Sequence, residues 1–124
     1  MNVVDSSGWL EYFSAGHNAD FFAPAIRDTE HLIVPVICVY EVFKRILQQQ
    51  GLSAAETNIA DLYNGELVSL TPSLAISAAV ISDKLRLPMA DSFILAIARA
   101  HEAVLWTQDE HFKEVEGVEF IAKS

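Results

Sequence analysis

Apolar residues along this chain form either short continuous runs or longer segments with helical spacing. Val3 and Val4 precede Asp5, and the run from Leu32 to Val34 precedes Pro35, so each run predicts a short buried strand. After the second run, apolar residues recur with the spacing i, i+3, i+4, i+7 and i+8, which predicts an amphipathic helix. These positions are Val39, Val42, Phe43, Ile46 and Leu47, and Gly51 is expected to end the helix.

The remaining segments continue this alternation of strands and helices. A helix is expected directly after Asp5, and another over residues 54–63 with Ser53 as its N-cap. Pro72 and Pro88 each precede a helical pattern, and proline is favoured at helix starts. The other predicted elements are strands at residues 67–70, 103–106 and 118–121 and a short helix after Asp109.

Short apolar strands that alternate with helices are typical of a parallel sheet, because parallel neighbours need a crossover connection. The chain of 124 residues also fits a single domain. We therefore predict an α/β fold over residues 1–124, with a central parallel sheet of four to five short strands and helices on both faces. Ligands of such sheets bind beyond the carboxyl ends of the strands, where Asp5 and Asp109 are expected.

The composition favours a protein that shares part of its surface with a partner. A hydrophobic fraction of 52% and a mean hydropathy of +0.26 are high for one small domain, so a homodimer or another tight complex is expected. Cys38 is the only cysteine, which excludes an internal disulfide and places this residue in the predicted core. Neither a signal peptide nor an apolar run of roughly 18 residues is present, so we expect a cytoplasmic protein with no membrane association.

The net charge of −9 at pH 7 is unfavourable for binding a polyanion such as RNA. The chain has 17 acidic residues against 8 lysines and arginines. Cations bound by some of these acids would neutralise them and reverse the sign of the local field. The overall charge therefore does not exclude an RNA site that depends on a metal ion.

Four acids lie at the ends of predicted strands or inside apolar helices, and each has a structural explanation of its own. Asp5 and Asp109 can be N-caps, and Asp91 can interact with the dipole of its helix. Glu41 can pair with Arg45, four residues later on one helix. Glu41 and Asp91, however, lie in apolar segments, where a carboxylate needs a counter-charge.

Carboxylates that lie close together raise one another's pKa values unless a divalent cation keeps them ionised. Oxygen ligands without histidine or cysteine favour Mg2+ or Mn2+ over Zn2+. The histidines show no paired spacing suited to zinc, and we assign His111, the one near an acid, to the surface. We therefore predict one metal pocket that holds one or two Mg2+ ions, with Mn2+ as the alternative ion, formed by Asp5, Glu41, Asp91 and Asp109.

The segments around these acids form four short motifs. They are VDSS at residues 4–7 followed by WL at 9–10, VYEV at 39–42, ADSFILA at 90–96 and TQDEHF at 107–112. In this order the motifs resemble the PIN-domain nucleases, and within them the VapC-type toxins of VapBC toxin–antitoxin modules. The resemblance covers nearly the whole chain, but residues 52–85 share only helical character with the family.

This resemblance implies a PIN-like Mg2+-dependent endoribonuclease that hydrolyses RNA to 5′-phosphate and 3′-hydroxyl products. It also implies a toxin that is inhibited by a cognate antitoxin, which typically covers the acidic pocket. Lys44, Arg45, Lys84 and Arg86 are candidate contacts to RNA phosphates, although ordinary surface charge explains each of them equally well. The catalytic positions implied are Asp5, Glu41, Asp91 and Asp109, with the hydroxyl groups of Ser6 and Thr107 beside them.

Two other functions fit an acidic pocket in an α/β fold. A receiver-like phosphoryl-transfer domain calls for adjacent acids after the first strand, but here Asp5 is followed by Ser6 and Ser7. A binding module with weak activity would instead use the acidic pocket to hold a basic segment of a partner. Acyl-phosphate labelling distinguishes the first function, and RNA cleavage by the antitoxin-free protein distinguishes the second.

Overall fold

The computed structural model describes residues 1–124 and contains one sheet of five parallel strands. The strands are β1 (Asn2–Val4), β2 (Leu32–Pro35), β3 (Glu66–Val68), β4 (Val104–Thr107) and β5 (Val118–Phe120), in the spatial order β3-β2-β1-β4-β5. In the register of the central strand, Val3 pairs with Ile33 of β2 on one side and with Leu105 of β4 on the other. The predicted α/β fold with a parallel sheet is confirmed.

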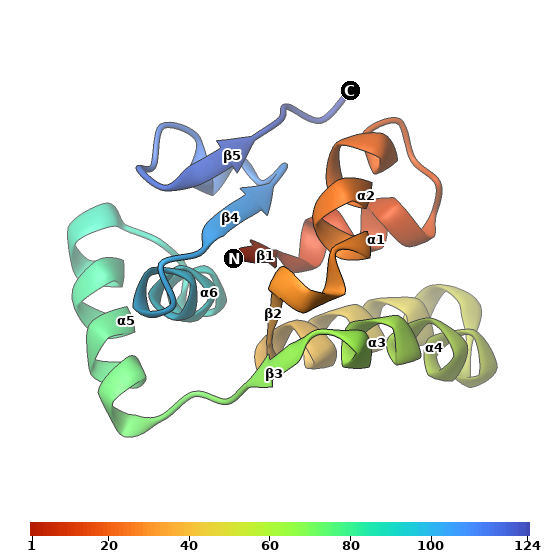
Figure 1. The fold of residues 1–124 in the computed structure, drawn as a ribbon, viewed down its shortest axis with the longest axis horizontal. Helices are drawn as coiled ribbons and strands as arrows, with labels where there is room; N and C mark the ends of the chain where they lie inside the picture. The colour runs from red at the N-terminus through yellow and green to blue at the C-terminus, as the bar shows by residue number, and fades with distance from the viewer.

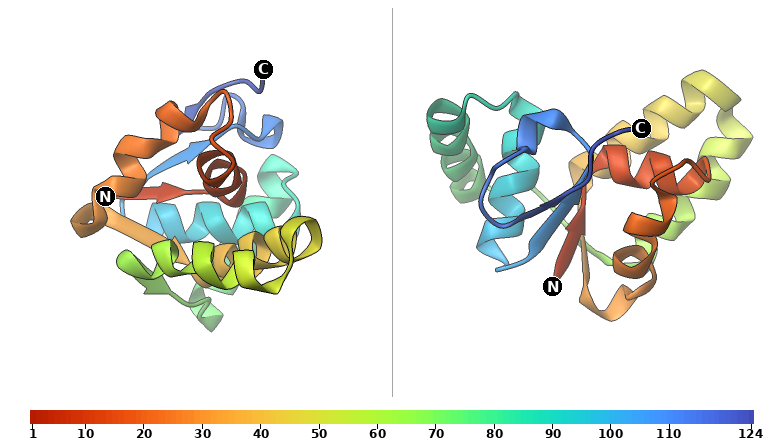
Figure 2. Two further views of the ribbon diagram at one scale, coloured as in Figure 1. Left: turned by 90° about the vertical axis from the view of Figure 1, so that its right-hand side faces the viewer. Right: turned by 90° about the horizontal axis from the view of Figure 1, so that it is seen from above.

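Helices cover both faces of this sheet (Figure 1). They are α1 (Ser6–Phe13), α2 (Ala19–Arg27), α3 (Val36–Gln50), α4 (Leu52–Ile59), α5 (Pro72–Leu85) and α6 (Met89–Ala100), with three short 3-10 segments, η1 (Thr29–His31), η2 (Ala60–Asn64) and η3 (Glu110–Phe112). Helices α5 and α6 lie on one side and α1 to α4 on the other, which the view from above also shows (Figure 2). None of the helices combines the length and the apolar character needed to cross a bilayer.

The order of the strands follows from the direction in which the chain crosses the sheet. From β1 through β2 to β3 the chain moves toward one edge, and it then returns to place β4 on the free side of β1. Because crossovers between parallel strands are right-handed, the two directions put their helices on opposite faces. The strand order therefore reverses between β1 and β4, which is the position where open α/β sheets bind ligands.

The core holds α1 tightly against the sheet. Trp9 of α1 and Phe22 of α2 are fully buried, as are Val3 and Val4 of β1. Gly8 allows this close approach, because a Cβ at that position would lie only 2.7 Å from the Phe22 ring and from Cγ1 of Val4. The first turn of α1 is thereby fixed over the end of β1. Cys38 is fully buried, as predicted for a core residue.

The structure differs from the sequence prediction in two helical regions. Helix α2 was not predicted, because Pro24 interrupts its pattern, but it buries Phe22 and Ile26 against the core. The predicted helical segment over residues 54–63 is found as α4 and η2, but the prediction that Ser53 is its N-cap is wrong. Gly51, with φ +93°, turns the chain directly from α3 into α4, and the tighter segment η2 replaces the predicted last turn.

Candidate metal centre

The carboxyl ends of β1 and β4 bring two of the predicted acids to one edge of the sheet. Asp5 directly follows β1, and Asp109 lies two residues after the end of β4, which is the neighbouring strand. Asp91 lies in the first turn of α6, and Glu41 lies on α3. Two helices from opposite faces of the sheet thus add an acid each to the point where the strand order reverses.

Asp5 is almost completely buried and is the N-cap of α1. Its Oδ1 accepts hydrogen bonds from Oγ of Ser7 at 2.7 Å and from the backbone N–H of Gly8 at 3.0 Å, and its Oδ2 accepts one from Oγ1 of Thr107 at 2.7 Å. Burial raises the pKa of Asp5 to about 6, although these three hydrogen bonds lower it, and the charge of Asp109 raises it further. A carboxylate offers about four lone-pair positions, so Asp5 can still accept a ligand.

Asp91 and Asp109 both contact the same nitrogen of the His111 ring. Nδ1 of His111 is 2.8 Å from Oδ2 of Asp91 and 3.2 Å from Oδ1 of Asp109. Burial raises the pKa of Asp91, the hydrogen bond from His111 lowers it, and the charges of Asp109 and Glu41 raise it again. The hydrogen bond to Asp91 and the charge of Asp109 raise the pKa of His111.

The two hydroxyl groups implied by the family resemblance each contact a predicted acid. Oγ of Ser6 donates to Oε1 of Glu41 at 2.6 Å. Oγ1 of Thr107 donates to Asp5 and accepts the backbone N–H of Asp109 at 2.9 Å, so it links the two strand-end acids. The alternative pairing of Glu41 with Arg45 is absent, because no ion pair within 4.0 Å joins them.

Ligand atoms of Asp91, Asp109 and His111 lie within 4.8 Å of one another, so these three residues could hold a metal ion. Asp5 and Glu41 are not in this set. The charge of Asp109 nevertheless raises the pKa of Asp5, and the charge of Glu41 raises the pKa of Asp91. The assignment of His111 to the surface was incomplete. Its side chain is 55% exposed, but η3 turns the ring back onto both aspartates.

No lysine or arginine neutralises these acids. Every ion pair shorter than 4.0 Å in the molecule joins a histidine to an aspartate, and at this site the histidine is His111. Burial and mutual repulsion therefore disfavour the charged carboxylates of Asp5 and Asp91. The carboxylate oxygens suit a hard divalent cation such as Mg2+ or Mn2+, whereas an imidazole nitrogen is a ligand that zinc and other transition metals prefer.

The titration of His111 provides a first test of this arrangement. In metal-free protein we expect His111 to titrate above its ordinary pKa of 6.5, because Asp91 and Asp109 favour the imidazolium. Asp91→Asn removes the carboxylate that accepts its hydrogen bond, so the pKa of His111 should fall. NMR titration of the imidazole signals measures both values, and an unchanged pKa in the variant would contradict the contact between these side chains.

A cavity of about 410 Å³ opens beside the acids, and its lining includes both Glu41 and Asp109. Tyr40, Lys44 and Arg45 line it from α3 together with Glu41, and Ser6, Ser7 and Leu10 line it from α1. Lys84 and Arg86, which were also candidate phosphate contacts, line none of the cavities of the molecule. A substrate that reaches the acids through this cavity therefore passes the basic residues of α3.

Comparisons with known proteins agree with this geometry. The family model described as the PIN domain matches residues 3–118. A toxin–antitoxin complex from Klebsiella pneumoniae is 19% identical with a TM-score of 0.79, covering 96% of this chain and 96% of that chain. VapC20 of Mycobacterium tuberculosis, described as a toxin that cleaves the sarcin–ricin loop, is 14% identical with a TM-score of 0.74, covering 94% and 95%.

A DNA-bound VapBC from Salmonella typhimurium is 13% identical with a TM-score of 0.75, covering 98% of both chains. At these identities the solved structures share the fold with this protein. No curated protein matches the chain by sequence.

Proposed function

This chain belongs to the PIN domain family, and from this membership we propose that it is a Mg2+-dependent endoribonuclease. One observation carries the proposal: acids from two strand ends and two helices meet where the strand order reverses, and no lysine or arginine neutralises them. Asp5 is buried with no basic partner, and a buried carboxylate is costly unless a counter-charge pairs with it.

We assign the binding of the ion to Asp5, Glu41, Asp91 and Asp109. When bound, a divalent cation lowers the pKa of water and neutralises the charge that develops on a reacting phosphodiester. Ser6 and Thr107 are positioning residues in this assignment, because their hydrogen bonds fix the carboxylates of Glu41 and Asp5. Thr107 also holds the backbone of Asp109, so its loss would displace two of the four acids.

The cleavage reaction is tested with purified protein that is free of any antitoxin. We expect RNA to be cut in the presence of Mg2+ to 5′-phosphate and 3′-hydroxyl ends, activity to disappear with EDTA, and Mn2+ to restore it. Mapping the new ends on total RNA measures the products and the sequence that is cut. Cleavage that persists in EDTA, or ends with a 2′,3′-cyclic phosphate, would show that the acids do not act through a metal ion.

We also propose that the protein is the toxin of a toxin–antitoxin module. The similar solved structures are described as toxin–antitoxin complexes or VapBC assemblies, which supports this role. The uncompensated acids would attract a basic side chain of a cognate antitoxin and so serve inhibition as well as catalysis. If the antitoxin-free protein binds a basic segment but cuts no RNA, the chain is an acidic binding module instead.

A homodimer remains part of this proposal. Exposed apolar side chains gather on α5 and at the start of α6, where Ile76 is 69%, Val80 is 50% and Met89 is 68% exposed. A second copy that covers this face would explain the high hydropathy of the sequence. Light scattering of the purified chain measures its mass, and a monomer at all concentrations would exclude this assembly.

A further inference from the structure

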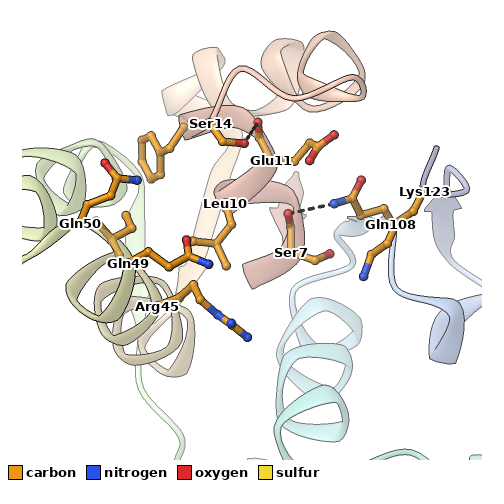
Figure 3. Close-up of a pocket in the computed structure, with 11 residues that line it drawn as sticks. Ser7, Leu10, Glu11, Ser14, Arg45, Gln49, Gln50, Gln108 and Lys123 are labelled. Atoms are coloured by element: carbon orange, nitrogen blue, oxygen red, sulfur yellow. Dashed lines mark hydrogen bonds between the residues drawn. The ribbon is translucent and has the colours of Figure 1, made fainter.

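The cavity beside the acids continues into a second cavity of about 310 Å³ along α1 and α3. Both cavities are lined by Ser7, Leu10 and Arg45, so together they form one groove that starts at Glu41 and Asp109. Figure 3 shows its far part, in which Arg45 from α3 and Lys123 from the C-terminal segment lie on opposite sides of Ser7 and Leu10. We call this continuous cavity the α1–α3 groove.

Three of the 8 lysines and arginines of this acidic chain line the α1–α3 groove, namely Lys44, Arg45 and Lys123. None of them has a carboxylate within 4.0 Å. The one acid in the far part, Glu11, accepts the backbone N–H of Asn18 at its Oε2 at 2.8 Å. The groove therefore holds three cations outside any ion pair, alongside the carboxylates of Glu11, Glu41 and Asp109.

The rest of the lining is polar and suited to nucleotides. Three consecutive glutamines at the end of α3 have exposed side chains that form no hydrogen bond within the protein, namely Gln48, Gln49 and Gln50. Their side-chain amides can therefore both donate to and accept from base edges. Tyr40 is 62% exposed at the end nearest the acids, with Nζ of Lys44 5.6 Å from the centre of its ring. An exposed aromatic ring next to a cation provides a face on which an unpaired base can stack.

We propose that the α1–α3 groove binds single-stranded RNA on one side of the bond that is cut. Lys44, Arg45 and Lys123 contact successive phosphates, and Tyr40 stacks on a base beside the acids. This inference rests on the proposed ribonuclease function and adds a path for the strand. An acidic protein segment is the less suitable occupant, because only Leu10, Phe13, Tyr40 and Ile46 offer it apolar contacts.

The path is tested by the binding of a fluorescent single-stranded RNA of about 16 nucleotides, which is long enough to occupy a groove that binds several nucleotides. Asp91→Asn protein with Mg2+ prevents cleavage during the measurement, and anisotropy gives the Kd at several salt concentrations. Lys44→Gln combined with Arg45→Gln should weaken binding roughly tenfold and reduce the salt slope by about 1.4, because each phosphate contact on a single strand contributes roughly 0.7. Arg45→Lys should retain the slope.

Two further variants separate the groove from general charge. Lys84→Gln combined with Arg86→Gln changes the net charge equally but lies outside the groove, so it should leave the Kd unchanged. Tyr40→Ser should weaken binding without changing the salt slope, because it removes stacking and no charge. The side chains substituted in the groove, the stacking and the control variants are exposed, and circular dichroism confirms that each variant is folded.

If the Lys44→Gln, Arg45→Gln variant and the Lys84→Gln, Arg86→Gln control lose RNA affinity equally, or if neither loses affinity, the proposed path is overturned. Binding of a polyglutamate peptide with the same dependence on Lys44 and Arg45, but no binding of RNA, would assign the groove to an acidic protein segment and overturn it as well. Failure of the ribonuclease proposal is seen separately, as absence of cleavage by the unsubstituted protein with Mg2+. In that protein the groove variant should raise KM and leave kcat unchanged.

Discussion

Asp91→Asn is expected to reduce Mg2+-dependent RNA cleavage by roughly a thousandfold, because loss of a metal ligand removes several kcal/mol of stabilisation from the transition state. Asp91 projects from the first turn of α6 toward Asp109 and His111, and its only basic contact is the imidazole of His111, 2.8 Å from its Oδ2. Asparagine keeps the size of the side chain, so the fold should persist while the affinity for the ion falls. Initial rates of oligonucleotide cleavage measure the effect.

The matched control for this variant is Asp83→Asn. Asp83 is an exposed acid on α5, and its substitution changes the net charge by the same amount as Asp91→Asn. We expect the control to cleave at the rate of the unsubstituted protein. If Asp91→Asn retains full activity while it is folded, the acids at the strand ends do not form the catalytic site.

Asp5→Asn is expected to abolish cleavage and at the same time to make the metal-free protein more stable. Asp5 is 3% exposed, and burial raises its pKa to about 6 from 3.8, so the charged carboxylate destabilises the folded state at neutral pH. Asparagine removes that charge and can still accept the hydrogen bonds of Ser7 and Gly8. Opposite effects on activity and stability are typical of residues retained for function.

The gain in stability from Asp5→Asn should be larger at neutral pH than at acidic pH. Because the pKa of Asp5 is raised in the folded state, its stabilising contribution is fully present below 3.8 and is lost as the pH rises through about 6. The variant should therefore gain up to about 3 kcal/mol relative to the unsubstituted protein above pH 7, and nothing below the unfolded pKa. At neutral pH this corresponds to a rise in Tm of the order of 10 °C.

Thermal unfolding in EDTA, followed by circular dichroism across this pH range, measures the difference between the two proteins. Adding Mg2+ should make the unsubstituted protein the one with the higher Tm, because an ion that binds only the folded state stabilises the protein that retains its ligands. The role given to Asp5 would be contradicted if the variant had a lower Tm than the unsubstituted protein at neutral pH in EDTA. It would also be contradicted if Mg2+ raised the Tm of both proteins equally.

The sequence predicts the fold well because its signals are local. Val3, Val4 and the run from Leu32 to Val34 define strands without any knowledge of their partners, and alternation with helices then requires a parallel sheet. The positions of Asp5 and Asp109 at one edge follow from the same pattern, since each comes after a strand. Helix α2 was missed because Pro24 lies inside it and its stability comes from packing of Phe22.

The parts of the site that were missed depend on contacts between distant segments. The ring of His111 reaches Asp91, twenty residues earlier, only because η3 turns back toward the start of α6. Lys123 enters the α1–α3 groove because the chain after β5 passes the N-cap of α2, where Nδ2 of Asn18 donates to the carbonyl of Ala122 at 3.1 Å. Neither spacing nor composition indicates such contacts, although the two-residue separation of Asp109 and His111 was a usable signal.

Anomalous diffraction from crystals of this protein soaked with Mn2+ tests the metal centre most directly. We expect an anomalous peak among the carboxylates of Asp5, Glu41, Asp91 and Asp109, at least one of them roughly 2.2 Å from the ion. The peak should be absent in crystals of Asp91→Asn protein grown and soaked in the same way. A peak elsewhere, or no peak among these four acids in the unsubstituted protein, would contradict the metal centre on which the proposed ribonuclease activity depends.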